Sequence, residues 1–238
     1  MAQRCWSTSF GKRAFDLIIS IAVLSAAFVI VAIIWTAVKL TSKGPALFRQ
    51  QRVGLDGKLF TIYKFRTMQV QACGRGPGLT REGDHRLTPL GKVLRKLKLD
   101  ELPQFYNVLR GDMSLVGPRP KLARYSASAD WRYRPGITGF ATLAFQREEE
   151  MLREVPPEEL DAFYDASIRP IKAELDSAYM SRASFISDFV IICSTVTACL
   201  RARQRTKRTE VPQHSVPEPA GINERHRIGM SLETESID

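Results

Sequence analysis

The sequence predicts an α+β protein that is attached to a membrane by one N-terminal hydrophobic helix and carries a compact domain of helices with a small β-hairpin. Three observations predict this fold class. Residues 17–38 form an uncharged apolar stretch, an Asp-Gly pair separates two apolar-rich stretches between residues 44 and 68, and apolar residues recur at helical spacing after Pro89 and after Phe185. The 238-residue chain therefore divides into an N-terminal segment (1–43), a compact domain (44–208) and a tail (209–238).

The composition limits the chemistry that the chain can perform. A net charge of +10 and a pI near 9.7 indicate an anionic partner, which is a nucleic acid, an anionic lipid or a phosphorylated substrate. The four cysteines are scattered without a CxxC pair, so we expect neither a disulfide framework nor a zinc site. Only His85 of the three histidines lies outside the polar tail. Catalysis by carboxylates is therefore better supplied than a Ser-His-Asp or Cys-His mechanism.

The apolar stretch is long enough to enter a membrane. As a helix, residues 17–38 would be roughly 33 Å long, which matches a hydrocarbon core of about 30 Å. Lys12 and Arg13 precede it and Lys39 and Lys43 follow it, so the positive-inside rule favours both ends on the cytoplasmic side. A re-entrant helix would satisfy both flanks, although the break it needs has no proline and only Ser25 to bend it. Spanning and re-entrant helices both remain open on these residues alone.

The first part of the compact domain predicts a β-hairpin. Asp56-Gly57 is a turn signal between two apolar-rich stretches. In the second strand, the two-residue period places Lys64 and Arg66 on one face, which is either a solvated edge or a phosphate-binding platform. Residues 69–84 are polar and Gly-rich, and we expect a loop there.

Two adjacent acids follow a basic helix. Helical spacing begins at Pro89, with Arg95 among the cations on the polar faces, and a second short helix is predicted from Pro103 to Gly111. Asp100 and Glu101 lie at the junction between the two helices. Acids at this position commonly do no more than stabilise a helix dipole, but the same helix N-terminus also suits a bound phosphate.

One arginine is held between two prolines. The turn Gly117-Pro118-Arg119-Pro120 follows a predicted buried strand over residues 113–116. Because both prolines fix φ, the guanidinium of Arg119 is presented from a stiff backbone, which suits bidentate contacts with phosphate.

The C-terminal third predicts two further helices and a tail. Residues 148–154 form an acidic helix whose glutamates we interpret as a solvated face. Residues 185–200 place apolar side chains on one stripe and are followed by a basic end, so this helix either lies in the plane of the lipid headgroups or is a core helix. Residues 209–238 have no apolar period, and we expect disorder.

Five motifs occur together in one order: KRAFDL at 12–17, FRQQRVG at 48–54, YKFRTM at 63–68, LTPLGKVLRKLKLDELPQFYNVLRGDMSLVGPRP at 87–120 and RPGITG at 134–139. In this combination the chain resembles, over roughly residues 12–200, the bacterial sugar transferase family. Members of this family are monotopic phosphoglycosyl transferases that use a polyprenyl phosphate to start glycan assembly, as in exopolysaccharide biosynthesis.

The resemblance implies an activity and a site. Asp100 and Glu101 would be the catalytic dyad and would also bind Mg²⁺, while Lys64, Arg95 and Arg119 would bind the phosphates of the substrates. A sugar-1-phosphate would pass from a UDP-sugar to undecaprenyl phosphate with release of UMP, through a covalent intermediate on Asp100. Residues 44–208 would be a cytoplasmic catalytic domain at the bacterial inner membrane, in contact with membrane lipid and not with nucleic acid.

Two departures from the family pattern bear on this expectation. The family usually breaks its membrane helix at Ser-Pro, where this chain has Ser25-Ala26, and it often continues RPGITG with WAQVNGR, where this chain has FATLAFQR at 140–147. The sugar-side contacts of that stretch therefore do not transfer. The alternatives are a membrane-tethered nucleic-acid-binding protein and a scaffold at the membrane surface. The sequence does not identify the sugar, the glycan pathway or the oligomeric state.

Overall fold

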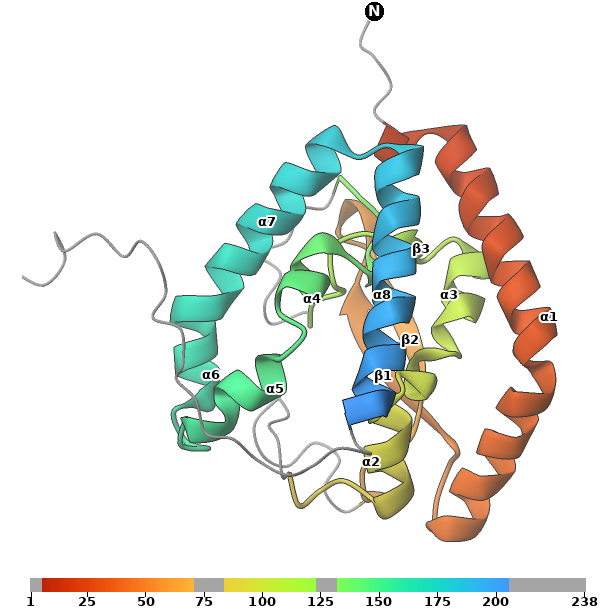
Figure 1. The fold of residues 1–238 in the computed structure, drawn as a ribbon, viewed down its shortest axis with the longest axis vertical. Coiled ribbons are helices and arrows are strands. Elements are labelled where there is room, and N and C mark those ends of the chain that lie inside the picture. The colour runs from red at the N-terminus through yellow and green to blue at the C-terminus, as the bar shows by residue number, and fades with distance from the viewer. Residues whose placement is uncertain (1–5, 71–83, 123–131, 206–238) are drawn as a thin grey trace, which may run out of the picture. The chain divides into compact units, whose positions relative to one another are not determined.

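The computed structural model describes residues 6–70, 84–122 and 132–205, which combine helices with two small sheets (Figure 1). The predicted α+β class with one long N-terminal apolar helix is confirmed. The predicted disordered tail and most of the predicted Gly-rich loop lie outside the described residues.

Helix α1 (Phe10–Thr41) is long and apolar enough to cross a membrane by length and composition. It begins at Ser9, whose hydroxyl accepts a hydrogen bond from the Lys12 amide at 3.1 Å. Its upper and lower halves run in different directions, so the helix is bent part-way along (Figure 1). Hydroxyl back-bonds of the kind considered for Ser25 are made by Thr36 and Thr41, nearer the C-terminal end.

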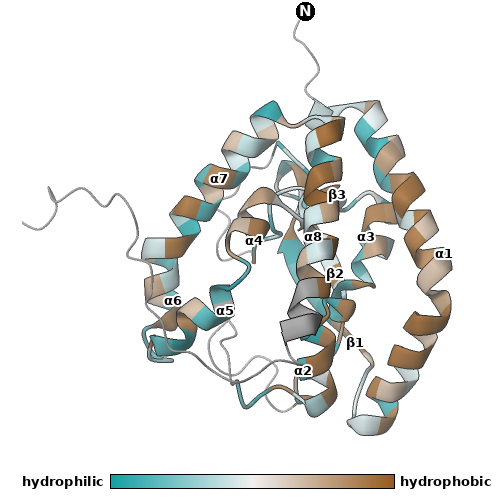
Figure 2. Ribbon diagram, viewed as in Figure 1, coloured by the Kyte–Doolittle hydropathy of each residue, from teal (hydrophilic) through white to brown (hydrophobic). Residues whose placement is uncertain are grey.

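Both ends of α1 pack against the same globular part. Near its start, Phe15 and Ile19 contact the core cluster built around Val108 and Met113. Near its end, Ile34 and Val38 are buried in a second cluster, with Ala46, Phe65 and Leu94. Large apolar side chains between these two regions are exposed, among them Ile21, Phe28 and Ile33. The ribbon of α1 is mostly apolar along this part of its length (Figure 2).

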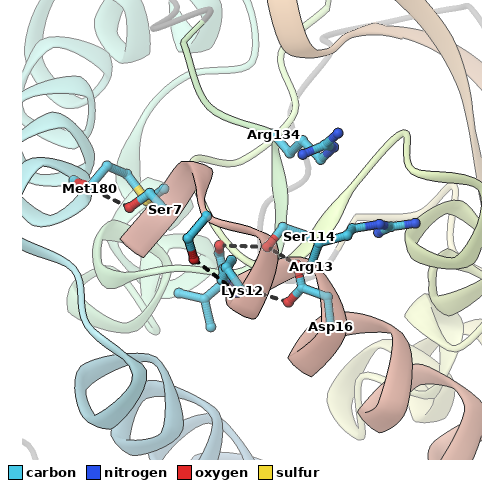
Figure 3. A pocket seen from close by; sticks show the side chains of 9 residues that line it. Ser7, Lys12, Arg13, Asp16, Ser114, Arg134 and Met180 are labelled. Carbon is cyan, nitrogen blue, oxygen red and sulfur yellow. Dashed lines mark hydrogen bonds and ion pairs between the residues drawn. The ribbon is translucent and has the colours of Figure 1, made fainter. Parts of the chain in front are cut away.

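A buried polar network joins the start of α1 to the rest of the fold (Figure 3). The ammonium group of Lys12 lies 2.9 Å from Asp16 and 3.0 Å from Asp188, and all three side chains are almost fully buried. Asp16 also accepts hydrogen bonds from the Ser114 hydroxyl at 2.8 Å and from the Leu115 amide at 3.2 Å. Removing one member of such a buried ion pair costs about 3–5 kcal/mol, so the network fixes α1 to strand β3 (Ser114–Val116) and to α8 (Phe185–Arg205).

Strands β1 (Leu47–Val53) and β2 (Leu59–Phe65) form the antiparallel hairpin that the Asp-Gly pair predicts. Asp56 and Gly57 adopt φ values of 55° and 74°, the left-handed conformation that Asp and Gly tolerate best. Lys64 and Arg66 do not form one platform. Arg66 is buried and donates to the Ser42 carbonyl and hydroxyl at 2.8 and 2.6 Å, so it caps the C-terminus of α1.

Strand β3 pairs in parallel with β4 (Gly136–Thr138), in the register Ser114 to Gly136 and Val116 to Thr138. Gly117 is required at the end of β3, because a Cβ there would lie 2.4 Å from the Arg134 carbonyl oxygen. The chain continues through α4 (Phe140–Ala144), α5 (Glu148–Met151) and α6 (Leu160–Phe163) to α7 (Arg169–Arg182).

Helix α8 has one face in the core and one exposed apolar face. Asp188 and Ile191 are buried, whereas Ile186, Phe189 and Val196 are more than half exposed. The predicted apolar stripe therefore includes residues that do not pack into the described domain. The exposed apolar face argues against a helix that is buried on all sides in the core.

Candidate active site

The two adjacent acids are placed by a short turn between helices. Helix α2 (Pro89–Lys96) starts at Thr88, whose hydroxyl accepts from the Gly91 amide at 2.9 Å, and α3 spans Gln104–Arg110. Between them Lys98 adopts φ 55°, which is uncommon for a residue with a Cβ, and a 3-10 turn covers Leu99–Glu101. As a result, Asp100 and Glu101 are both buried, at 7% and 8% exposure, and are not helix punctuation on a solvated surface.

Glu101 is held by two cations from separate parts of the chain. One of its carboxylate oxygens, Oε1, accepts from Lys64 Nζ at 2.7 Å and from Arg119 Nη2 at 3.2 Å. Strand β2 supplies Lys64, and the proline-flanked turn after β3 supplies Arg119. Although burial alone would raise the pKa of Glu101, these cations hold it far below its usual value, so the side chain is a carboxylate at any physiological pH.

Asp100 has the opposite environment. Its Oδ1 is buried and has no hydrogen-bond partner among the residues that the structure describes. Burial, followed by the charge of Glu101, raises the pKa of Asp100, and the nearby cations Lys64, Arg95 and Lys98 only partly offset the increase. An adjacent pair of carboxylates whose pKa values are pushed apart is typical of a catalytic site, because the two groups then perform different tasks.

All five predicted site residues lie in one region. Lys64, Glu101 and Arg119 are in contact, Asp100 is adjacent to Glu101, and Arg95 lies within electrostatic range of Asp100. The Arg119 side chain keeps 44% of its surface exposed, so part of its guanidinium faces solvent beside the dyad. The geometry thus places a buried carboxylate oxygen that lacks a partner among the described residues beside cations of the kind that can neutralise phosphate charge.

Protein side chains at the site can supply only part of the coordination shell of a divalent cation. Within residues 6–70, 84–122 and 132–205, no group of three or more His, Cys, Asp or Glu side chains is arranged to hold a metal ion. Mg²⁺, however, usually takes one or two carboxylates and completes its shell with water and substrate phosphates. The orphaned Oδ1 of Asp100 and the adjacent Glu101 fit that mode of binding.

The structure adds residues that the sequence did not indicate. Glu148, interpreted above as part of a solvated face, is only partly exposed and pairs with Lys172 at 2.6 Å; for this residue a simple solvated face was wrong. Lys172 also donates to the Tyr164 hydroxyl at 3.2 Å. Asp176 lies four residues after Lys172 on α7. It accepts hydrogen bonds from the backbone amide of Ala141 at 3.2 Å and from that of Arg119, so it supports the turn that presents the arginine. Burial raises the pKa of Asp176 to about 6.

These residues could not be found from the sequence because their segments meet only through tertiary packing. One local signal was present, since Lys172 and Asp176 are four residues apart and share a face of a helix. Nothing in the sequence placed that face beside Arg119.

The family model described as bacterial sugar transferase matches residues 7–202. The chain is 36% identical over 204 residues to the UDP-N-acetylgalactosamine-undecaprenyl-phosphate N-acetylgalactosaminephosphotransferase of Aeromonas hydrophila, and this match covers 81% of the chain and 44% of the relative. It is 38% identical over 195 residues to the uncharacterized sugar transferase EpsL of Bacillus subtilis, with coverage of 79% and 87%. It is 46% identical over 140 residues to the UDP-glucose:undecaprenyl-phosphate glucose-1-phosphate transferase of Caulobacter vibrioides, with coverage of 55% and 52%. The chain thus matches about half the length of two of these relatives and most of the third.

Proposed function

The chain belongs to the bacterial sugar transferase family, and from that membership we propose that it transfers a sugar-1-phosphate from a UDP-sugar to undecaprenyl phosphate and releases UMP. The observation that carries the proposal is the dyad, in which Glu101 is fixed by Lys64 and Arg119 while the neighbouring Asp100 keeps an unpaired oxygen. The three relatives named above are sugar or sugar-phosphate transferases, so they give the nucleic-acid-binding alternative no support.

The proposed reaction has two steps, because direct attack of one phosphate on another faces charge repulsion. In the first step, a carboxylate oxygen of Asp100 attacks the β-phosphorus of the UDP-sugar. The bond from that phosphorus to the bridging oxygen breaks, UMP leaves with the electron pair, and an aspartyl phosphosugar remains. In the second step, an oxygen of undecaprenyl phosphate attacks the same phosphorus, the bond to the Asp100 oxygen breaks, and the carboxylate is restored.

The neighbouring groups support both steps. Lys64, Arg95 and Arg119 neutralise the diphosphate, and Arg119 does so from a backbone fixed by two prolines and by Asp176. The raised pKa of Asp100 makes its carboxylate more basic, and hence a better nucleophile once it is ionised. Mg²⁺ held by Asp100 and Glu101 together with substrate phosphate would add further neutralisation of charge.

The membrane arrangement supports the lipid acceptor. Because both ends of α1 pack against one globular part, we propose that α1 enters the bilayer and returns, leaving residues 44–208 as a cytoplasmic catalytic domain at the inner membrane. The exposed apolar face of α8 would lie in the headgroup plane. An acceptor phosphate is then reachable without extraction of its polyprenyl chain from the bilayer.

The test uses UDP-sugars that carry a radiolabelled β-phosphate. Without acceptor, the wild-type protein should take up label to at most one per chain, release it with hydroxylamine as acyl phosphates do, and pass it to lipid when undecaprenyl phosphate is added. Asp100→Asn should trap no label. Label on that variant would move the nucleophile elsewhere, with Glu101 the first candidate. Lipid product without any trapped label would replace the two-step scheme by direct transfer. Wild-type turnover in Asp100→Asn would remove Asp100 from the chemistry, whereas no UMP release by the wild-type protein from any UDP-sugar would favour a scaffold.

A further inference from the structure

A second polar cluster lies next to Arg119, and the proposed chemistry does not use it. It consists of Glu148 at the start of α5, Tyr164 at the start of a π-helical turn (Tyr164–Ile168), and Lys172 on α7. Lys172 Nζ donates to Glu148 Oε2 at 2.6 Å and to the Tyr164 hydroxyl at 3.2 Å, and Tyr164 is hydrogen-bonded to Glu148 in turn. Single π-helical turns are rare and occur often at functional sites.

The cluster has hydrogen-bonding capacity left over. An ammonium group has three donors, and Lys172 uses two of them within the cluster. A carboxylate accepts about four hydrogen bonds, which is more than Glu148 receives from its two partners. The Glu148 side chain keeps 24% of its surface exposed and that of Lys172 keeps 12%, so a ligand can reach both groups from solvent.

The cluster lies close to the turn that carries Arg119. Lys172 is one helical turn along α7 from Asp176, which accepts from the Ala141 amide at 3.2 Å and lies beside Gly139, and Gly139 contacts Gly117, the first residue of that turn. The charge of Glu148 contributes to raising the pKa of Arg119, after the larger effect of Glu101, and the charge of Arg119 acts in turn on Lys172. Arg119 therefore contacts the dyad through Glu101 and lies within electrostatic range of Glu148 and Lys172. A group attached to a phosphate that Arg119 binds would extend into the region between the dyad and the cluster.

The charge and ring contacts of the cluster indicate which part of a nucleotide-sugar it can bind. Glu148 and Lys172 cancel, so the cluster does not attract a phosphate as Lys64, Arg95 and Arg119 do. An aromatic base would need an open ring face for stacking, but the ammonium of Lys172 lies 5.6 Å from the centre of the Tyr164 ring and 5.2 Å from that of Phe145. A carboxylate beside an ammonium group matches neighbouring hydroxyls, one donating to Glu148 and one accepting from Lys172.

We propose that Glu148, Tyr164 and Lys172 bind hydroxyl groups of the hexose in the UDP-sugar donor. This inference rests on the proposed function, since it assumes a sugar attached to the β-phosphate at the dyad. It assigns the choice among sugars to α5 and α7, whereas the dyad and its cations act on the phosphates that all donors share.

The test compares Glu148→Gln with Glu150→Gln, a matched control on the same short helix whose carboxylate is more than half exposed. Initial rates of UMP release are measured with the accepted UDP-sugar and with analogues that lack one hexose hydroxyl each. Loss of a charge-assisted hydrogen bond corresponds to roughly a tenfold to hundredfold effect, so Glu148→Gln should raise KM for the full donor by about tenfold or more. Glu150→Gln should behave as wild type, and inhibition by UMP should be unchanged in both.

The analogues separate recognition from support of the fold. In wild type, the analogue that lacks the contacted hydroxyl should raise KM by about as much as Glu148→Gln does with the full donor. In Glu148→Gln, the same analogue should raise KM little further. Tyr164→Phe, which deletes only a hydroxyl, should show the same dependence on the analogue and guards against misfolding of the glutamate variant. Equal losses for every analogue, a parallel loss of UMP inhibition, or wild-type KM in both variants would each overturn the assignment.

If wild type releases no UMP from any UDP-sugar, the proposed function fails first; normal wild-type turnover with unaffected variants refutes the hexose site alone.

Discussion

Substitutions at the two dyad positions should abolish activity alike but change stability in opposite directions. Asp100→Asn and Glu101→Gln each replace a carboxylate by an amide of nearly the same shape. The native environments differ, because Asp100 Oδ1 is buried without a partner while Glu101 Oε1 accepts from two cations. Removal of the Asp100 charge should therefore raise the free energy of unfolding, and removal of the Glu101 charge should lower it.

The expected sizes follow from these contacts. A hydrogen bond to a charged group contributes about 1.5–3 kcal/mol, and the half-exposed Arg119 contributes at the low end, so Glu101→Gln should lower the free energy of unfolding by about 2 kcal/mol. Burial and the charge of Glu101 raise the pKa of Asp100, so its ionised form costs stability; the amide removes that buried charge, and Asp100→Asn should gain on the order of 1 kcal/mol. For a chain of this size, 1 kcal/mol shifts Tm by about 2–4 °C. Glu101→Gln should therefore melt about 4–8 °C below wild type, and Asp100→Asn about 2–4 °C above it.

The pH dependence has a definite sign for each residue. The pKa of Asp100 is raised in the folded protein, so its ionisation destabilises the fold. The stability of Asp100→Asn relative to wild type should therefore increase as pH rises from about 3.8 through the raised pKa. The pKa of Glu101 is lowered, so its contribution is present above about 4.5 and is lost as pH falls toward the folded value. Thermal melts of detergent-solubilised protein at neutral and acidic pH, with UMP release measured in parallel, check both. Equal Tm shifts for the two variants, or a lower Tm for Asp100→Asn at neutral pH, would refute the opposite roles assigned to the two carboxylates.

Three further outcomes are expected. Arg119→Lys should stay folded but lose at least about tenfold in kcat/KM, because lysine keeps the charge without the planar fork; wild-type turnover would reduce Arg119 to a turn residue. Cysteines placed before Leu17 and after Val38 should both be protected from an impermeant thiol reagent in intact cells, and labelling of either one from outside would show that α1 spans the membrane. Deletion of residues 209–238 should leave UMP release intact in detergent, since this segment has no apolar pattern to bury, and a loss of turnover would count against that interpretation.

The sequence was sufficient wherever the signal is local. The apolar run, the Asp56-Gly57 turn and the helix start at Pro89 each depend on neighbouring residues, and each element is found where its pattern predicts it. The rigid Arg119 also follows from its two flanking prolines. The meeting of Lys64, Glu101 and Arg119 came from the family resemblance, since no spacing rule brings residues so far apart in sequence into contact.

The remaining features depend on tertiary packing. The period of the second strand places Lys64 and Arg66 on one face, but the chain turns after Phe65 and Arg66 caps α1. Glu148 looks like one of several exposed acids in the sequence, and only the approach of α7 gives it a buried partner in Lys172. Charged residues usually lie in solvent, so a sequence gives no sign of a partly buried ion pair between distant segments.

The buried network around Lys12 gives the membrane helix a direct connection to the site. Asp16 on α1 accepts hydrogen bonds from Ser114 and Leu115 on β3, and β3 leads directly into the turn that carries Arg119. Asp188 connects the same ammonium group to α8, whose opposite face is apolar and exposed. In the proposed membrane arrangement, a bilayer that receives α1 and α8 would lie at a fixed height relative to Arg119 and the dyad. Because the phosphate of a polyprenyl acceptor lies at the headgroup level, this connection would position the attacking oxygen within reach of Asp100 by the packing of the fold and not by a flexible tether.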